Sequence, residues 1–381
     1  MLEFNDEEQQ FRQEVRRFAH RRLIPNARQW DEGAPMTPDI LKELTGLGLS
    51  GLRVPQEYGG TEASFTMMGI AAEEIGRGDT SVGSYVSLPA MLAETLRAGN
   101  KDLQKHWYPR IAEGKVIAAF ALTEPEAGSD AASLRTRAKR DGDDWVIDGE
   151  KSSITFAGNA DVSVVFARTG GPGARGVSTF IVPLNVEGVG REVYDTPGER
   201  LTQRGALRFD GVRVPADHLV GAEGEGFIRA MSNFDYSRTI TSLLYVGAAY
   251  QSLDETIAYV KQRQAFGVPV AKFEGVSFKI AEHYVRMEAA RLLCYQALRR
   301  KDRGLPHSKD TAVAKIMSME AAFDTVHACV LLHGHYGYNK ALPLEMRLRN
   351  ILGLEIGAGT YEALKLTIIR ELMGKEAMPY K

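Results

Sequence analysis

The chain has 381 residues, of which 44% are hydrophobic and 25% are charged, and its formal net charge at pH 7 is −2. These proportions are typical of a soluble globular protein of two or three domains, and they exclude a disordered, collagen-like or coiled-coil chain. The near-neutral charge gives no support for nucleic-acid binding.

The sequence also argues against several other classes of protein. It has no apolar stretch long enough for a membrane span, and its first residues carry no apolar run typical of a secretory signal. Its two cysteines, Cys294 and Cys329, lie in apolar segments and cannot form a disulfide framework. No Cys/His cluster has the spacing of a metal site. We therefore expect a cytoplasmic protein that holds no metal.

The first region is predicted to be helical. Phe11, Val15 and Phe18 recur at helical spacing with polar residues between them, and residues 66–75 and 88–98 resume this pattern. The basic pairs at residues 16–17 and 21–22 are interpreted as a solvated helix face. We predict an all-α N-terminal domain over residues 1–117.

A β-rich region follows. Residues 162–167 and 177–182 are dense in β-branched and aromatic side chains. The dipeptides Asp141-Gly142, Asp148-Gly149 and Asp210-Gly211 are typical of turns between strands. We predict a middle β domain over residues 118–221.

The last region returns to helical spacing. An apolar stripe runs from Ile240 to Val260 and is ended by Gly267 and Pro269. Further helices are expected over residues 276–298, 310–332 and 358–373. We predict a C-terminal helical domain over residues 222–381, so the fold class is α+β with the order helical, β, helical.

Five motifs carry the chemistry. The loop at residues 123–130, T-E-P-E-A-G-S-D, is rich in small and hydroxyl residues, which can bring backbone N–H groups close to a phosphate, a flavin ring or a carbonyl. Read alone, the loop favours a polar turn before a β-hairpin. The other motifs follow in order as Lys151–Thr155, Arg263–Gly267, His333–Tyr338 and Ile356–Thr360.

In this order, the five motifs resemble the acyl-CoA dehydrogenase family over the whole chain. The T-E-P-x-x-G-S-D loop is the most specific signature of that family. The resemblance implies a C-terminal four-helix bundle, bound FAD, an acyl-CoA substrate and a homotetramer built as a dimer of dimers. It also implies an external electron acceptor such as an electron-transfer flavoprotein.

The resemblance places the FAD between the β domain and the C-terminal bundle. Arg263 and Phe266 correspond to residues that a second subunit supplies to the cofactor. The expected cofactor-binding residues are Phe120, Leu122, Thr123, Gly128, Ser129, Ser153, Thr155, Arg263, Phe266, Gly334, Gly337 and Thr360. The expected substrate-binding residues are Ser84, Ser129, Phe234, Asp235, Arg238 and Gly357.

The family's chemistry needs a proton acceptor. The flavin takes a hydride from Cβ of the thioester while a base removes the proton from Cα. That proton is acidic because a backbone N–H, here that of Ala358, and a flavin hydroxyl polarise the thioester carbonyl. A change of side chain leaves this backbone donor intact.

The base itself is missing from both positions where the family carries a glutamate, which here are Ala358 and Ser237. Neither side chain abstracts a proton unaided. Asp79 is a speculative replacement, because it is the only carboxylate in the 78–85 segment that should line the far end of the acyl pocket; the favoured alternative is that it caps a helix. Ser153 stands where a tryptophan usually covers the flavin, which opens space beside the ring.

Three functions are compatible with this pattern. The first is FAD-dependent dehydrogenation of a short, branched or alicyclic acyl-CoA, such as a cyclohexane- or cyclohexene-carboxyl thioester, with a base elsewhere. The second is an elimination, such as desulfination of an acyl-CoA, that needs no Cα proton abstraction. The third is a non-catalytic partner subunit. The intact flavin motifs favour the first.

Overall fold

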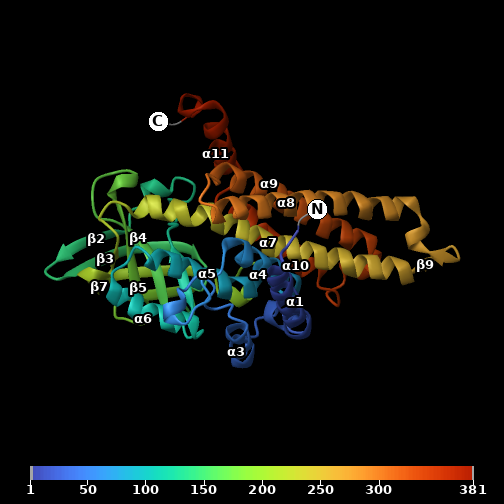
Figure 1. The fold of residues 1–381 in the computed structure, drawn as a ribbon, viewed down its shortest axis with the longest axis horizontal. Coiled ribbons are helices and arrows are strands. Elements are labelled where there is room, and N and C mark those ends of the chain that lie inside the picture. Colours follow the sequence, from blue (N-terminus) through green and yellow to red (C-terminus); the bar gives the residue numbers. More distant parts are fainter. Residues whose placement is uncertain (1–2, 380–381) are drawn as a thin grey trace.

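The computed structural model describes residues 3–379 and has the predicted order of helical, β and helical regions (Figure 1). The N-terminal helices are α1 (Asp6–Phe18), α2 (Ala27–Asp31), α3 (Pro38–Gly46), α4 (Phe65–Gly78), α5 (Thr80–Leu96) and α6 (Lys101–Ala112). The middle strands are β1 (Ala118–Ala121), β2 (Arg137–Asp141), β3 (Asp144–Ile154), β4 (Val162–Arg168), β5 (Val177–Pro183), β6 (Val189–Val193), β7 (Gly205–Pro215) and β8 (Leu219–Val220).

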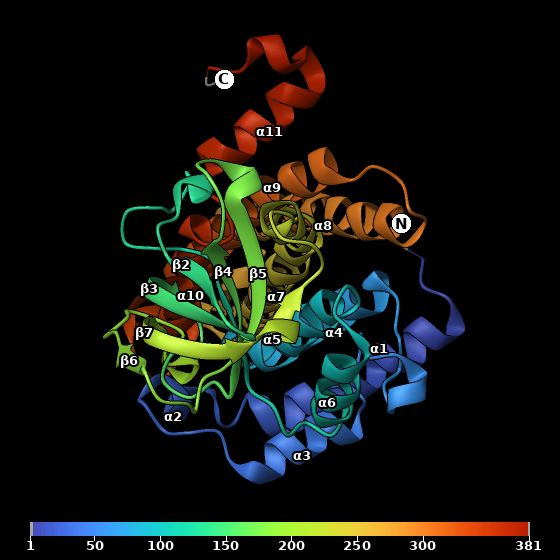
Figure 2. The same ribbon diagram turned by 90° about the vertical axis from the view of Figure 1, so that its left-hand side faces the viewer.

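The C-terminal helices are α7 (Gly226–Gln262), α8 (Glu274–Asp302), α9 (Ser308–Leu332), α10 (Leu344–Ile356) and α11 (Tyr361–Met373). A small hairpin of β9 (Gln264–Ala265) and β10 (Val268–Pro269) joins α7 to α8. The sheet lies at one end of the molecule, the hairpin lies at the other, and α11 projects from the body (Figures 1 and 2). No helix within residues 3–379 is both long and apolar enough to cross a membrane.

The sheet has the strand order β6-β7-β3-β2-β4-β5-β8, with β1 paired in parallel to β4. Only one of the three predicted turn dipeptides is a turn: Asp141-Gly142 joins β2 to β3. Asp148-Gly149 and Asp210-Gly211 lie opposite each other inside β3 and β7, where the register shifts between Ile147 and Gly149. The positive φ values of Gly149 and Gly211 serve a β-bulge there.

The end of the chain also differs from the prediction. The last helix begins at Tyr361 instead of residue 358, because Ala358 and Gly359 have φ values of 54° and 96°, outside the helical region. Helix α10 was not predicted. Its sequence contains Gly353, which weakens the helical pattern. The helix is also only partly buried, and its apolar residues form no clear stripe along one face.

Helices α4 and α7 cross at very short range, and a glycine on each makes this crossing fit. A Cβ atom added at Gly76 of α4 would overlap the carbonyl oxygen of Leu244, and one added at Gly247 of α7 would overlap that of Glu73. The backbones therefore touch without an intervening side chain. This contact fixes the N-terminal domain against the long helix of the C-terminal bundle.

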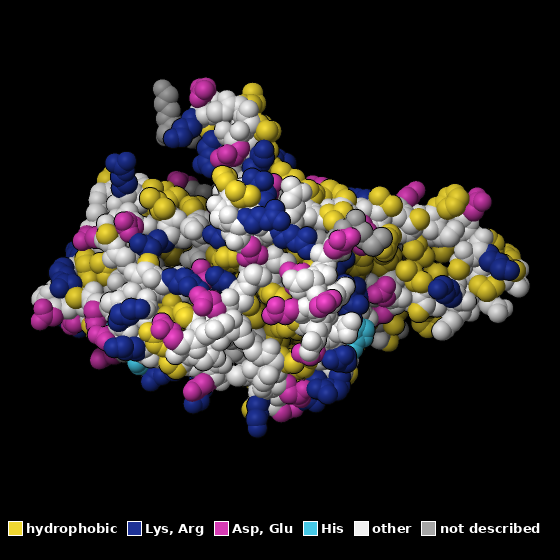
Figure 3. All heavy atoms as spheres, viewed as in Figure 1, with side chains coloured by type: hydrophobic (Ala, Val, Ile, Leu, Met, Phe, Trp, Pro, Cys, Tyr) yellow, Lys and Arg dark blue, Asp and Glu magenta, His cyan; other side chains and the backbone are white. Residues whose placement is uncertain are grey.

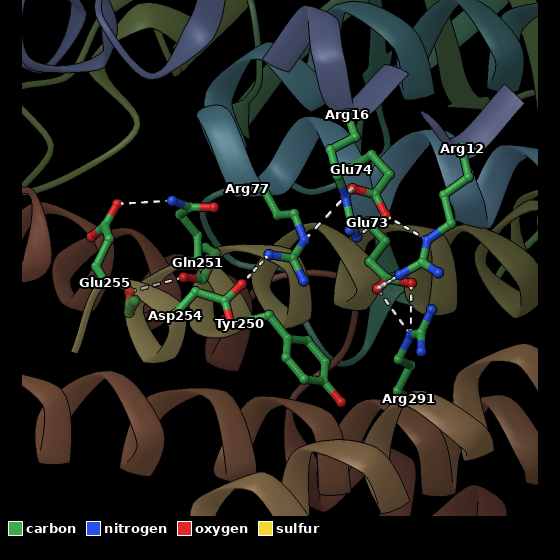
Figure 4. Close-up of polar contacts among 12 residues, drawn as sticks. Arg12, Arg16, Glu73, Glu74, Arg77, Tyr250, Gln251, Asp254, Glu255 and Arg291 are labelled. Carbon is green, nitrogen blue, oxygen red and sulfur yellow. Dashed lines mark hydrogen bonds and ion pairs between the residues drawn. The ribbon is translucent and has the colours of Figure 1, made fainter. Parts of the chain in front are cut away.

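Two adjacent carboxylates on α4, Glu73 and Glu74, are buried beside this crossing (Figure 4). Glu74 accepts hydrogen bonds from Arg12 and Arg16 of α1 at 2.7 and 2.6 Å. Burial alone raises the pKa of Glu74, but Arg16, with Arg77 and Arg12, outweighs burial and holds that pKa below its usual value.

Glu73 pairs with Arg291 of α8 at 2.9 Å and accepts a hydrogen bond from Tyr295 at 2.7 Å. The interpretation of the 16–17 pair as a solvated face is therefore wrong for Arg16, because its guanidinium is one of the groups that compensate a buried charge. Each buried carboxylate has partners on more than one helix, so the pair joins α1, α4 and α8.

The crossing predicts a large effect of one methyl group. We expect Gly247→Ala to lower the free energy of unfolding by about 2–3 kcal/mol or more, because the added carbon overlaps the backbone of α4. Denaturant unfolding of the purified protein measures this effect. Gly275→Ala on α8 is the matched control, since no atom lies within 4 Å of its added Cβ. Equal stability of the two variants would contradict the tight crossing.

Candidate functional site

A cavity of about 420 Å³ lies between the β domain, α5, α7 and the segment that joins α10 to α11. It contains most of the residues predicted for the cofactor and the substrate. The expected cofactor residues that line it are Phe120, Leu122, Thr123, Gly128, Ser129, Ser153, Thr155 and Thr360. The expected substrate residues that line it are Ser84, Ser129, Phe234 and Gly357.

The remaining cofactor residues lie elsewhere in the single chain. Arg263 and Phe266 are at the hairpin that follows α7, and Gly334 and Gly337 are in the turn after α9. Phe266 is 95% exposed at the hairpin end of the bundle, where apolar side chains gather on the surface (Figure 3). The chain by itself therefore does not bring these four residues to the cavity.

The loop that carries Thr123 and Ser129 is anchored from beneath by a buried ion pair. The Lys151 ammonium donates to the Glu124 carboxylate at 2.8 Å and to the carbonyl oxygen of Leu122 at 3.0 Å. Glu124 also accepts the backbone N–H groups of Arg135 and Thr136. Burial lowers the pKa of Lys151 to about 8, although Glu124 opposes this shift. These bonds fix the loop on the β3 strand.

The loop at residues 357–359 is held by two basic side chains. The Lys315 ammonium of α9 donates to the carbonyl oxygens of Gly357 and Gly359. The Arg238 guanidinium of α7 donates to the carbonyl oxygen of Ala358 at 2.8 Å. These bonds hold Ala358 in the left-handed region, which an alanine adopts only when its surroundings require it.

Within residues 3–379 the Ala358 N–H finds no hydrogen-bond acceptor, so it is free to donate to a group in the cavity. Arg238 and Asp235, both predicted to bind substrate, do not line the cavity themselves. Asp235 pairs with Arg238 at 3.2 Å and accepts a hydrogen bond from Ser308 at 2.6 Å. Their observed contacts position the loop.

The polar groups of the cavity fit a flavin. Thr123, Ser129, Ser153 and Thr155 present hydroxyl groups, and none of these hydroxyls bonds to another part of the described chain. The flavin ring offers several nitrogen and oxygen atoms that such groups can bond. Gly128 leaves open space in the same loop, because no atom lies within 4 Å of an added Cβ.

Asp79 does not line the cavity. Its buried carboxylate caps α5 and accepts the backbone N–H of Ser81 at 2.8 Å and of Val82 at 3.3 Å. Burial raises the pKa of Asp79 to about 6 against the effect of these bonds, and the nearby charge of Glu199 adds to the rise. This geometry favours the capping role over that of a base.

Sequence reasoning missed Glu199, Arg204 and Tyr245, which also line the cavity. Glu199 and Arg204 lie between β6 and β7, and Tyr245 lies inside the long apolar stripe of α7. None of the three residues belongs to a recognisable motif, and a tyrosine in an apolar stripe is normally predicted to be a core residue. Only the folded chain brings the three side chains together.

Comparison with known proteins decides the family. Residues 5–115, 119–212 and 224–373 match the N-terminal, middle and C-terminal domains described for acyl-CoA dehydrogenases. The chain belongs to the acyl-CoA dehydrogenase family. The predicted family and fold class are thereby confirmed, and the protein is an FAD-dependent enzyme that dehydrogenates acyl-CoA.

The relatives of this acyl-CoA dehydrogenase match it from end to end. The mitochondrial short-chain specific acyl-CoA dehydrogenase of Bos taurus is 35% identical over 98% of the chain and 91% of its own length. The butyryl-CoA dehydrogenase structure from Megasphaera elsdenii superimposes with a TM-score of 0.94 at 30% identity, covering 98% of this chain and 100% of that one. A glutaryl-coenzyme A dehydrogenase in complex with glutaryl-CoA gives 0.94 at 29% identity, covering 99% and 98%.

The capping role of Asp79 predicts a stability effect that depends on pH. Because its folded-state pKa is raised from 3.8 to about 6, Asp79 stabilises the fold below pH 4, and this contribution is lost as the pH rises through 6. Asp79→Asn keeps a good cap without the charge. We expect this variant to be about 1–3 kcal/mol more stable than the wild type at pH 7 and no more stable at pH 4. Thermal unfolding at several pH values measures the difference.

The Asp79→Asn variant also distinguishes a capping role of Asp79 from a role as the catalytic base. If Asp79→Asn reduces its flavin at the wild-type rate, Asp79 is not the proton acceptor. A stability gain that is the same at pH 4 and pH 7 would contradict the assigned titration.

Proposed function

We propose that this enzyme dehydrogenates short, branched or alicyclic acyl thioesters and removes the proton with a group other than the family's usual glutamate. The proposal rests on the contrast between the backbone and the side chain of Ala358. The backbone donor of Ala358 is held in place by Lys315 and Arg238, whereas the side chain at that position is a methyl group.

The shape of the cavity supports a compact acyl group. Ala358, Ser237 and Ser153 are small and all line the cavity. Family members usually carry a glutamate at either position 358 or position 237, and a tryptophan at position 153. The small residues of this chain leave room beside the reacting carbons for a branch or a ring. The relatives named above act on small acyl groups, including butyryl-CoA and glutaryl-CoA.

Each group of the site has a definite task in this proposal. The Ala358 N–H donates to the thioester carbonyl and makes the neighbouring C–H bonds acidic. Thr123, Ser129 and Thr155 hold the cofactor and keep the acyl chain against it. When bound, FAD supplies the hydride acceptor, and we propose an electron-transfer flavoprotein or a similar carrier as the external acceptor.

The exposed hairpin end supports a homotetramer. Phe266 and Tyr338 are 95% and 88% exposed, which is unusual for aromatic side chains of an isolated chain. In the proposed assembly a neighbouring subunit covers them, and the neighbour's Arg263 and Phe266 complete the cofactor site.

A panel of thioesters tests the substrate class. We expect branched, cyclohexane- or cyclohexene-carboxyl-CoA to bleach the flavin absorbance band anaerobically, and butyryl- and octanoyl-CoA to bleach it slowly. Rapid bleaching by the straight-chain thioesters would refute the proposal. A flavin that no thioester bleaches would favour elimination chemistry instead.

Restoring the carboxylate tests the missing base directly. We expect Ala358→Glu to raise the rate of flavin reduction by butyryl-CoA by at least about 100-fold, since general base catalysis contributes roughly 10²–10⁴-fold. Ala358→Gln is the matched control, because it has the same size and cannot take the proton. Equal rates in the two variants, with FAD bound in both, would show that the pocket is not shaped for removal of the Cα proton.

A further inference from the structure

The cavity contains an unexpected charged cluster, formed by Glu199, Arg204 and Tyr245. Glu199 is the only carboxylate among the cavity-lining residues in the described part of the chain. It is 8% exposed and lies in the loop before β7 with a φ of 52°. Nothing in the chemistry described above uses these three side chains.

The carboxylate is held on several sides. The Tyr245 hydroxyl of α7 donates to Oε1 of Glu199 at 2.5 Å, and the Arg204 guanidinium donates to Oε2 at 3.3 Å. The Glu199 N–H donates to Oδ1 of Asn350 at 2.9 Å, and the Asn350 amide donates to Thr80 at 3.1 Å. The middle and C-terminal domains therefore hold the Glu199 side chain, and Asn350 links the backbone of Glu199 to Thr80 of the N-terminal domain.

Glu199 keeps spare capacity to accept hydrogen bonds. A carboxylate has about four acceptor sites, and the two side-chain donors occupy two of them. Gly353 of α10 faces this group, and a Cβ added there would lie 3.9 Å from Oε2. The absence of a side chain at Gly353 leaves space next to the carboxylate.

The cluster lies at a distance from the thioester end of the cavity. Arg238, which holds the Ala358 loop, precedes Tyr245 on α7 by about two helical turns, or roughly 10 Å along the axis. Both ends line the same cavity, so an acyl group that starts at the Ala358 N–H and extends along α7 would bring its distal carbons toward Glu199.

We propose that Glu199 accepts a hydrogen bond from a hydroxyl group on the distal part of the acyl chain. The inference rests on the proposed function and narrows its substrates to short or alicyclic acyl thioesters that carry a distal hydroxyl. A plain alkyl or ring end would cover Glu199 and Arg204 without replacing the water it displaces, which is unfavourable.

Charge disfavours an acyl group with a charged end. The Glu199–Arg204 ion pair is neutral overall, so a carboxylate or an ammonium group at the end of the acyl chain would add an uncompensated charge beside it. A neutral hydroxyl adds no charge and can donate to Glu199 while it accepts from Arg204.

The test compares matched ligand pairs on the FAD-loaded enzyme. The pairs are cyclohexanecarboxyl-CoA with its 4-hydroxy derivative, and butyryl-CoA with 4-hydroxybutyryl-CoA. The shift of the flavin spectrum gives Kd, and stopped flow gives the limiting rate of flavin reduction. We expect the wild type to bind the hydroxylated member of a pair about 10–100-fold more tightly, as one hydrogen bond to a charged group provides.

Variants assign this preference to the cluster. We expect the double variant Glu199→Leu/Arg204→Leu, which leaves no unpaired charge, to bind both members of a pair equally. The near-isosteric Glu199→Gln should keep a preference of only a few fold, and it serves if the double variant does not fold. Glu288→Gln is the matched control, because Glu288 also accepts a hydrogen bond from a tyrosine of α7, Tyr250, outside the cavity. It should keep the full preference.

Three results would overturn the inference. The first is equal affinity of the wild type for both members of each pair. The second is a preference that survives in the double variant. The third is a loss of flavin reduction in Glu199→Gln with an unchanged Kd, which would make Glu199 the proton acceptor. Failure of every thioester to reduce the flavin would refute the proposed function, whereas the Kd ratios would still test the hydroxyl contact.

Discussion

The contact between the backbones of α4 and α7 is the constraint on which the site depends. Helix α7 passes against the N-terminal domain at Gly247, carries Phe234 and Tyr245 to the cavity, and places Arg238 against the Ala358 loop. A fixed crossing therefore sets the distance between the groups that α5 and α7 contribute. Beside the same crossing, the buried carboxylates Glu73 and Glu74 hold α4 to α1 and α8, since their arginine partners come from α1, α4 and α8.

Much of this architecture could be predicted from the sequence. Helical and alternating periods gave the order of the three regions, and five short motifs gave the family and the residues that line the flavin side of the cavity. Such signals are local, because each motif is a short run of consecutive residues. The glycines at 149 and 211 show the limit: their dipeptides have the composition of turns, yet they lie inside two paired strands at a bulge, where Gly149 pairs with Phe209.

The residues that escaped prediction owe their roles to contacts between distant segments. Arg16 looks like part of a solvated face until Glu74, 58 residues later, is placed beside it. Glu199, Arg204 and Tyr245 meet only because the β6–β7 loop folds against α7. No local pattern distinguishes these outcomes.

The loop at Ala358 separates two tasks that one glutamate usually combines in this family. Its backbone conformation is imposed from outside by Lys315 and Arg238, so the amide keeps its direction whatever side chain the residue carries. Evolution can therefore exchange the proton acceptor without rebuilding the group that activates the substrate. A fold organised in this way can acquire new substrates through single substitutions at this position, because the N–H group that activates the substrate belongs to the backbone and is kept.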